Sequence, residues 1–328
     1  MNLILYHNNC PDGWCAAYIC KLKYPEAALM PLNHGLSPEA LDELMFEVRG
    51  KDVIMVDYSL RTRELNDQLN SLAKSFRILD HHKTAQAVLE GASYATFDMK
   101  RSGAGLAWDY LFGKDSVLVG NPTPQDPFGV LPINGSRPWW VDYTEDQDLW
   151  NWQLDHSEEV NAYLMVQPRT VETWNEITKI GVDDAYANGV GVRQYIEYYT
   201  RSVVAEAQEG VLHFQTGTLE SEDSSISVPT WIDYRTAVLN IPYAGVSEAG
   251  NALCKAGYPI ALLWFERGDG VIQFSLRGDG SVDVSAIAKS FGGGGHHNAA
   301  GFQLSLDRGR VLVDRILGRQ ITPGIYIQ

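Results

Sequence analysis

The segment Ile78-Leu79-Asp80-His81-His82 joins a short apolar run directly to three polar side chains. A short apolar run of this kind is typical of a buried strand, so the polar residues stand where that strand ends. Two earlier strands end in the same way, because His7 follows Leu3–Tyr6 and Asp57 follows Val53–Val56. The carboxyl ends of parallel strands meet at one edge of a sheet, so we expect these side chains to converge on one crevice.

Apolar runs alternate with amphipathic stretches throughout the first half of the chain. The expected strands are Leu3–Tyr6, Ala28–Pro31, Val53–Val56, Arg77–Leu79 and Tyr94–Phe97, and the expected helices are Gly13–Lys23, Pro38–Val48, Thr62–Lys74 and Ser102–Phe112. Such alternation predicts an α/β fold with a parallel sheet and helices on both faces. The stretch Gly120–Pro138 is rich in Pro and Gly and indicates a long loop.

A second pattern begins at Ala237. It predicts the strands Ala237–Ile241, Ile260–Phe265 and Val271–Leu276 and the helices Ser247–Lys255 and Val284–Ser290, followed by a glycine run and Phe302–Leu306. This pattern favours a smaller, mixed α/β domain at the C-terminal end. We therefore expect a first domain over residues 1–189, a connecting helix over 190–211 and a second domain over 212–328, with a solvated acidic loop at Leu219–Ser227.

The charge balance bears on the partners of the protein. The 328 residues include 26 Lys and Arg against 41 Asp and Glu, a formal net charge of −15 at pH 7. A polyanion repels long nucleic acid, so no binding to a long duplex is expected, whereas a metal site would still admit a small anion. The oligomeric state is left open, and a homo-oligomer is compatible with the sequence.

The sequence also indicates where the protein works. It contains neither an apolar run of the roughly 18 residues that cross a bilayer nor the basic and hydrophobic regions of a signal peptide. The four cysteines lack the spacing of a zinc site, so we expect reduced thiols. They are Cys10, Cys15, Cys20 and Cys254. These observations predict a cytoplasmic protein without a membrane partner.

The polar residues at the strand ends suit a divalent metal. Carboxylate and imidazole ligands favour Mn²⁺, with Zn²⁺ or Fe²⁺ as alternatives. Asp12-Gly13 follows the first strand after a short loop and adds a further carboxylate. A carboxylate that bridges two ions would permit two-metal phosphoryl chemistry.

The four motifs together resemble the DHH phosphoesterase superfamily. Asp80-His81-His82 after an apolar strand matches its name-giving motif, and His7…Asp12-Gly13 and Asp57 match two further motifs. Phe291-Gly-Gly-Gly-Gly-His296-His297-Asn-Ala-Ala-Gly301 resembles the glycine-rich signature of the DHH-associated substrate-binding domain. The resemblance covers nearly the whole chain. The family includes RecJ single-strand exonucleases, oligoribonucleases of the nanoRNase type, cyclic-dinucleotide phosphodiesterases and relatives that split pyrophosphate or polyphosphate.

The resemblance implies a role for each matching residue. The implied metal ligands are His7, Asp12, Asp57, His81 and Asp146, with Asp57 as the ligand that bridges two ions. His82 would point toward the substrate, and Asp80 would orient an imidazole. The fourth-motif ligand has two rivals, because Asp142 and Asp148 lie in the same acidic stretch as the favoured Asp146.

One position departs from the family pattern. The family usually has two aspartates, two residues apart, around the first-strand turn, but here Cys10 precedes Asp12 and Trp14 follows it at that spacing. Cys10 could ligate as a thiolate or be a small buried thiol. We therefore expect the metal position beside His7 to be weak, altered or empty, or to fill only with substrate.

The second domain contributes the expected substrate contacts. Consecutive glycines let backbone N–H groups approach a phosphate, and Arg277 at a strand end is a candidate anion clamp. The expected substrate-binding residues are Arg277, Gly293, Gly294, Gly295 and His296. The tryptophans Trp139, Trp140, Trp150 and Trp152 could stack nucleobases, but packing in the core is favoured for them.

These observations and the resemblance together predict a metal-dependent phosphodiesterase that hydrolyses short oligonucleotides or small nucleotide phosphodiesters. The expected cofactor is Mn²⁺, as one or two ions, with Mg²⁺ or another divalent ion as the alternative. Two other functions are left open: hydrolysis of a phosphoanhydride such as pyrophosphate, and nucleotide binding with degraded catalysis.

Overall fold

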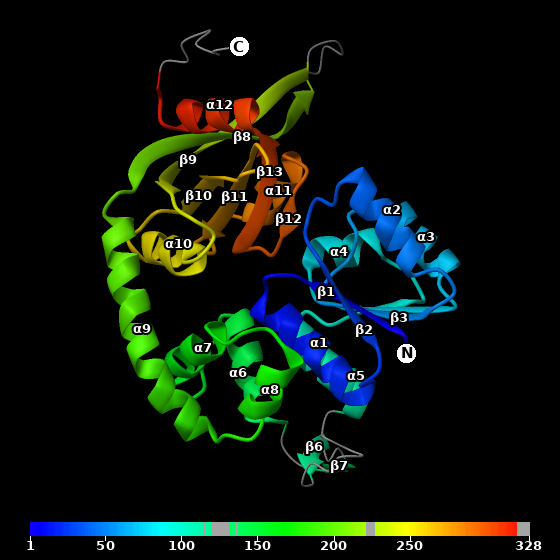
Figure 1. Ribbon diagram of the computed structural model, residues 1–328. Helices are drawn as coiled ribbons and strands as arrows, with labels where there is room; N and C mark the ends of the chain where they lie inside the picture. The colour runs from blue at the N-terminus through cyan, green and yellow to red at the C-terminus, as the bar shows by residue number, and fades with distance from the viewer. Residues whose placement is uncertain (114–115, 120–130, 135–136, 221–226, 320–328) are drawn as a thin grey trace. The chain divides into compact units, whose positions relative to one another are not determined.

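The computed structural model describes residues 1–113, 116–119, 131–134, 137–220 and 227–319 (Figure 1). The chain divides into two compact units, Met1–Gln194 and Tyr195–Gln328. Most of the loop expected at Gly120–Pro138, and residues 221–226 of the expected acidic loop, lie outside the described residues. Within the described residues, no helix is long and apolar enough to cross a membrane.

A five-stranded parallel sheet forms the centre of the first unit. Its strands are β1 (Leu3–His7), β2 (Ala28–Leu32), β3 (Asp52–Val56), β4 (Ser75–Asp80) and β5 (Ala95–Phe97). They lie in the order β2-β1-β3-β4-β5, and every neighbouring pair is parallel. This arrangement confirms the predicted sheet, and it places the ends of β1, β3 and β4 side by side.

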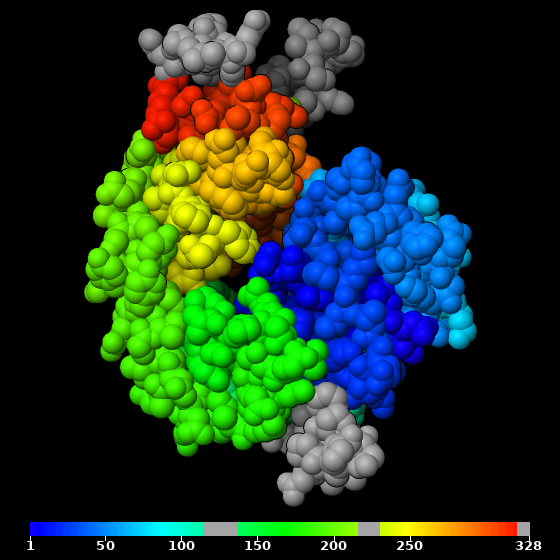
Figure 2. Space-filling view, viewed as in Figure 1, coloured from blue at the N-terminus to red at the C-terminus, as the bar shows by residue number. Residues whose placement is uncertain are grey.

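Helices cover both faces of this sheet, as the sequence predicts. They are α1 (Pro11–Lys23), α2 (Pro38–Glu47), α3 (Arg63–Leu72), α4 (Lys83–Val88) and α5 (Gly103–Phe112). Because side chains alternate along a strand, Ile4 and Tyr6 enter the core that includes α1 and α5, whereas Leu3 and Leu5 enter the core that includes α2 and α3. Part of the outer surface of α2 is visible in blue in Figure 2.

A helical extension completes the first unit. It contains α6 (Trp139–Asp148), α7 (Ser157–Met165), α8 (Val171–Ile177) and the start of α9 (Val182–Val204), and a two-stranded sheet of β6 (Ser116–Val119) and β7 (Leu131–Asn134) precedes it. Trp140 is 1% exposed and packs edge-on against Tyr18, Trp108 and Trp174. Its role is therefore core packing, and its loss would cost about 3–5 kcal/mol of stability.

The expected connecting helix needs correction. The sequence predicts it over 190–211, but α9 begins at Val182 and ends at Val204, and the boundary between the two units falls inside it. Residues from Gln208 onward already belong to a long strand. Helical periodicity alone placed both ends of the helix too late, because the strand that follows is also partly apolar.

The second unit is a mixed α/β domain, as predicted. Its elements are β8 (Gln208–Glu220), β9 (Ser227–Asn240), α10 (Val246–Lys255), β10 (Ile260–Glu266), β11 (Val271–Gly278), α11 (Val284–Ser290), β12 (Gly294–Gly295), β13 (Ala299–Ser305) and α12 (Leu306–Ile316). The strand order is β12-β13-β11-β10-β9-β8, in which only the β9–β10 pair is parallel. The long pairing of β8 with β9 was not predicted.

Candidate active site

Asp57 lies at the centre of the polar cluster in the first unit. It follows β3 directly, is 1% exposed and has a φ of +52°, a left-handed conformation that residues other than glycine rarely adopt. Two glycines make room for its side chain: a Cβ at Gly103 would lie 2.5 Å from the Asp57 Cβ, and one at Gly13 would lie 3.0 Å from its Oδ2. Backbone strain of about 1–3 kcal/mol at a buried carboxylate is typical of a functional site.

The two carboxylate oxygens of Asp57 face different imidazoles. Oδ1 lies 3.1 Å from Nε2 of His81, and Oδ2 lies 3.4 Å from Nδ1 of His7. Although burial would raise it, the two histidines hold the pKa of Asp57 well below its ordinary value. One carboxylate that presents one oxygen to each of two ligand groups has the geometry of a bridging ligand.

His81 stands among carboxylates from three other parts of the fold. Its Nε2 lies 3.7 Å from Oδ2 of Asp12, 3.1 Å from Oδ1 of Asp57 and 3.5 Å from Oδ2 of Asp148. Burial disfavours a charged imidazole, but the carboxylates of Asp148 and Asp57 outweigh it and raise the pKa of His81 well above its ordinary value. The cluster therefore attracts positive charge strongly.

Asp12 is held by the N-terminus of a helix. It lies in the first turn of α1, and its Oδ2 and Oδ1 accept hydrogen bonds from the backbone N–H groups of Gly103 and Ala104 at 2.5 and 2.9 Å, where α5 begins. Burial and the neighbouring carboxylates of Asp148 and Asp57 nevertheless raise its pKa well above the ordinary value. Two buried carboxylates and the more exposed Asp148 beside one imidazole fit a divalent cation, which would relieve their mutual repulsion.

The fourth-motif residue beside His81 is Asp148 rather than the favoured Asp146. The carboxylate of Asp146 is engaged elsewhere, because its Oδ1 accepts a hydrogen bond from Gln153 N at 2.9 Å and its Oδ2 accepts one from Ser157 Oγ at 2.6 Å. It therefore holds the loop after α6 in place. Asp148, two residues later and at the end of α6, points to the opposite side of the helix, toward His81.

The other rival, Asp142, belongs to a network behind the site. It forms an ion pair with Arg137, whose guanidinium also donates to Oε1 of Glu145 at 2.6 Å. Glu145 in turn accepts hydrogen bonds from Arg101 Nη1 at 3.0 Å and from the backbone N–H of Ser102 at 3.1 Å. Sequence reasoning did not identify this network, which fixes the start of α5 and thereby the donors to Asp12.

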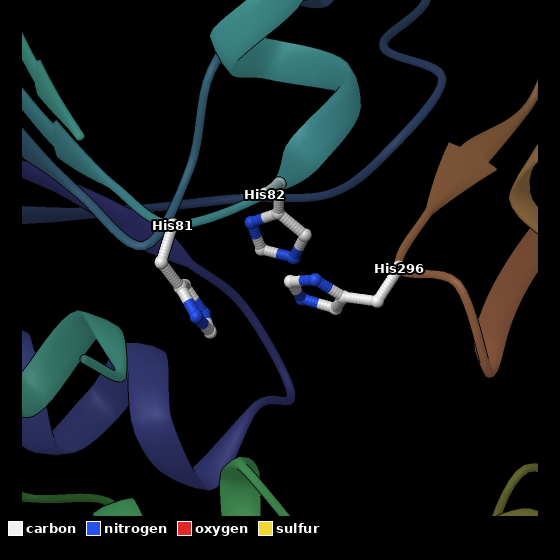
Figure 3. A group of neighbouring side chains, drawn as sticks. All are labelled: His81, His82 and His296. Atoms are coloured by element: carbon white, nitrogen blue, oxygen red, sulfur yellow. The ribbon is translucent and has the colours of Figure 1, made fainter. Parts of the chain in front are cut away.

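Asp80 orients His82. The Oδ1 of Asp80 lies 2.7 Å from Nδ1 of His82, and its Oδ2 accepts a hydrogen bond from Ser59 Oγ. Burial alone would lower it, but the Asp80 carboxylate raises the pKa of His82. Figure 3 shows His81 and His82 side by side after β4, with ring centroids 4.9 Å apart. The arrangement agrees with the orienting role that the resemblance implies for Asp80.

Sequence reasoning missed His34, which lies beside His7. The two ring centroids are 4.6 Å apart, and His34 also stacks on Tyr58 at 5.2 Å. His34 follows β2, whose end lies at the same edge of the sheet as the end of β1. The sequence offered one signal for His34, because it stands two residues after Leu32, where β2 ends, as the other site residues stand after their strands.

The expected substrate residues of the second unit have mixed surroundings. The N–H groups of Gly292 and Gly293 already donate to the carbonyls of Lys289 and Ala288, so these two donors are not aimed at a phosphate. A Cβ at Gly293 would also lie 2.0 Å from the carbonyl oxygen of Gly301, so close packing of β13 explains this glycine.

The rest of the glycine run enters the sheet. Gly294 and Gly295 form β12, and His296 begins the turn to β13, where Figure 3 labels it. Arg277 donates to Ser247 Oγ at 2.8 Å and to its neighbour's carbonyl, and among the residues that the structure describes it has no carboxylate partner. A partly buried guanidinium without a close ion pair in the described part of the chain suits an anionic ligand.

Comparisons with known proteins give two sequence matches. Residues 239–318 match the DHHA1 domain. The uncharacterized protein R106 of Acanthamoeba polyphaga mimivirus is 25% identical over 341 residues, which cover 96% of this chain and 70% of that protein.

Two solved structures match over nearly the whole chain. RecJ from Thermus thermophilus, in complex with Mn²⁺, has a TM-score of 0.52 at 14% identity, and the match covers 97% of this chain and 51% of RecJ. The pGpG-specific phosphodiesterase PggH from Vibrio cholerae has a TM-score of 0.45 at 10% identity, over 97% of this chain and 98% of PggH. The chain thus has a RecJ-like two-unit fold, a DHHA1 match within its second unit and an Asp80-His81-His82 motif at the end of β4.

Proposed function

We propose that this protein is a metal-dependent phosphodiesterase that hydrolyses short oligonucleotides or small nucleotide phosphodiesters. The observation that carries the proposal is the placement of Asp57, with Oδ1 toward His81 and Oδ2 toward His7, at the strand ends of a parallel sheet. A carboxylate that is shared by two groups of ligands can hold two metal ions, and two-metal sites of this kind serve phosphoryl transfer.

The donor set supports a divalent ion of the Mn²⁺ or Mg²⁺ type. Asp12, Asp57, His81 and Asp148 together offer carboxylate oxygens and one imidazole nitrogen, which suit such ions. A bound ion supplies Lewis-acid activation of water and of the phosphoryl oxygens. His82, oriented through Nδ1 by Asp80, presents its other ring nitrogen to the substrate and stabilises the charge that develops on the phosphoryl group.

Charge and aromatic exposure favour a short nucleotide substrate. The net charge of −15 opposes the approach of a long polyanion but only weakly opposes a dinucleotide. Trp150, two residues beyond Asp148, is 40% exposed and has a φ of +57°. We propose Trp150 as a base-stacking side chain. Separately, we propose Arg277 of the second unit as a phosphate-binding residue.

Release of mononucleotide from a labelled dinucleotide tests the proposal. We expect turnover with Mn²⁺, none after chelation, and a loss of several orders of magnitude in Asp57→Asn, which keeps the shape of the side chain but removes its charge. Asp155→Asn is the matched control, because Asp155 is an exposed carboxylate in the same acidic stretch. Full activity in Asp57→Asn, or release of phosphate from pyrophosphate but no cleavage of any dinucleotide, would overturn the proposal.

A further inference from the structure

Cys10 lies directly before α1, close to His7 and Asp57. It is the residue that precedes α1, a position that favours Ser, Thr, Asp or Asn because their side chains cap the helix. The Cys10 side chain makes no capping hydrogen bond, and it forms no disulfide. Neither helix capping nor cross-linking therefore accounts for this cysteine.

The sulfur instead faces two other ligand atoms. One ligand atom from each of His7, Cys10 and Asp57 lies within 4.8 Å of the other two. Oδ2 of Asp57 and Nδ1 of His7 are both buried and, within the described part of the chain, neither has a hydrogen-bond partner of acceptable geometry. A buried carboxylate oxygen in a residue that is 1% exposed requires a partner, and this one lies 3.4 Å from Nδ1 of His7.

The spacing of these atoms fits one ion. Two atoms that each lie about 2.1 Å from a tetrahedral zinc ion are roughly 3.4 Å apart. Nδ1 of His7 and Oδ2 of Asp57 are 3.4 Å apart. They are too poorly aligned for a hydrogen bond but correctly separated for two ligands of one metal.

We propose that His7, Cys10 and Asp57 bind a thiophilic divalent ion such as Zn²⁺ through nitrogen, sulfur and oxygen. The thiol of Cys10 loses its proton to solvent as it becomes a ligand. Three protein ligands leave the fourth position open to water or to a substrate oxygen, as in catalytic zinc sites. The proposal rests on the proposed function only in that both use Asp57 as the shared ligand.

The two positions would then select different ions. The position at Asp12, Asp57 and His81 offers mainly oxygen atoms, which suit Mn²⁺ or Mg²⁺. The position at Cys10 offers a soft sulfur, which discriminates against those ions and in favour of Zn²⁺ or Co²⁺. The cysteine thus makes the second position selective for a different metal instead of abolishing it.

Titration of the metal-stripped full-length protein with Co²⁺ tests this inference by spectroscopy. We expect a thiolate-to-cobalt charge-transfer band that saturates at one equivalent, is lost in Cys10→Ser and is displaced by Zn²⁺. Cys254→Ser is the matched control, because Cys254 is also a partly exposed free thiol but lies in α10. A wild-type protein without the band, or a band that persists in Cys10→Ser, would overturn the inference.

Calorimetry gives a second reading. Cys10→Ser should weaken Zn²⁺ binding at least roughly tenfold and change Mn²⁺ binding at the other position little. Loss of a residue that only supports a metal ligand already costs about 10–100-fold in metal affinity, and loss of the ligand itself should cost at least as much. Cys10→Asp should lose the cobalt band and bind a second Mn²⁺ more tightly. This second variant keeps the test decisive if Cys10→Ser does not fold. Unchanged Zn²⁺ affinity in both variants would contradict the inference.

The two proposals fail in different ways. Hydrolysis of a dinucleotide with Mn²⁺ by a protein that shows no cobalt–thiolate band would leave the proposed function standing and refute the role of Cys10. A cobalt–thiolate band in a protein that cleaves no nucleotide with any divalent ion would support the metal site and refute the proposed function.

Discussion

Replacing Gly103 by alanine should disable the metal cluster while the fold survives. Gly103 begins α5, and its N–H donates to Asp12. The added methyl carbon would lie 2.5 Å from Cβ of Asp57 and 2.8 Å from Oδ2 of Asp12. Neither neighbour is a flexible chain end, because both carboxylates are buried and one follows a strand directly.

The size of the effect follows from these distances. Carbon atoms in ordinary contact are about 3.5 Å apart, so Asp57 and α5 must separate by roughly 1 Å. A misplacement of about 1 Å at a reacting centre costs on the order of 100-fold in rate. Overpacking at a buried position costs about 1–3 kcal/mol of stability, which a domain can survive.

Three measurements follow the change. Calorimetric titration with Mn²⁺ should show binding weakened in Gly103→Ala, dinucleotide hydrolysis should fall by about two orders of magnitude, and urea unfolding should show a modest loss of stability. Gly191→Ala is the control, since a Cβ at Gly191 in α9 would meet no atom within 4 Å. Hydrolysis within about threefold of wild type in Gly103→Ala would refute the packing argument.

Three further predictions concern single side chains. Asp148→Asn should weaken Mn²⁺ binding with little loss of stability, whereas Asp146→Asn should lower stability by about 1–3 kcal/mol and keep Mn²⁺ binding, as calorimetry and urea unfolding would show. Burial raises the pKa of Asp80, but His82 outweighs burial and lowers it from 3.8 to about 2. The metal-free wild type should therefore lose stability as the pH falls through this window, whereas Asp80→Asn should not. Urea unfolding at each pH would show the difference. Trp150→Ala should raise KM for a dinucleotide by an amount equivalent to about 1–3 kcal/mol per stacked base, without changing Mn²⁺ affinity.

Much of the site followed from the sequence because it depends on local pattern. Each mainly apolar run of three or four residues in the first half predicts a strand, and a polar residue that directly follows such a run must lie at the end of that strand. The convergence of Asp57 and His81 was therefore predictable once the sheet was known to be parallel. Asp80-His81-His82 also carries the resemblance to the DHH phosphoesterase superfamily, because the motif and its strand context are both local.

Tertiary structure decided the features that depend on helix phase and on contacts between distant segments. Asp146 and Asp148 are the same residue type in the same acidic stretch, but they lie about 200° apart around α6. Only the packing of that helix reveals which of the two faces His81. A carboxylate at the last residue of a helix opposes the helix dipole, which was a weak signal for Asp148. The long β8–β9 pairing was missed for a similar reason. The stability of each strand depends on the side chains of the strand beside it, and the sequence alone does not show which strands are neighbours.

The position of Cys10 also shows what the sequence determines and what only the tertiary structure decides. Its sequence position marks the absence of an expected carboxylate, and that absence alone suggests a weakened metal position. Only the fold shows that its sulfur lies within 4.8 Å of a ligand atom of His7 and of a ligand atom of Asp57. Sequence determines which ligand types are present, whereas the distances that decide whether they can share one ion arise from the packing of β1, β3 and α1 around them.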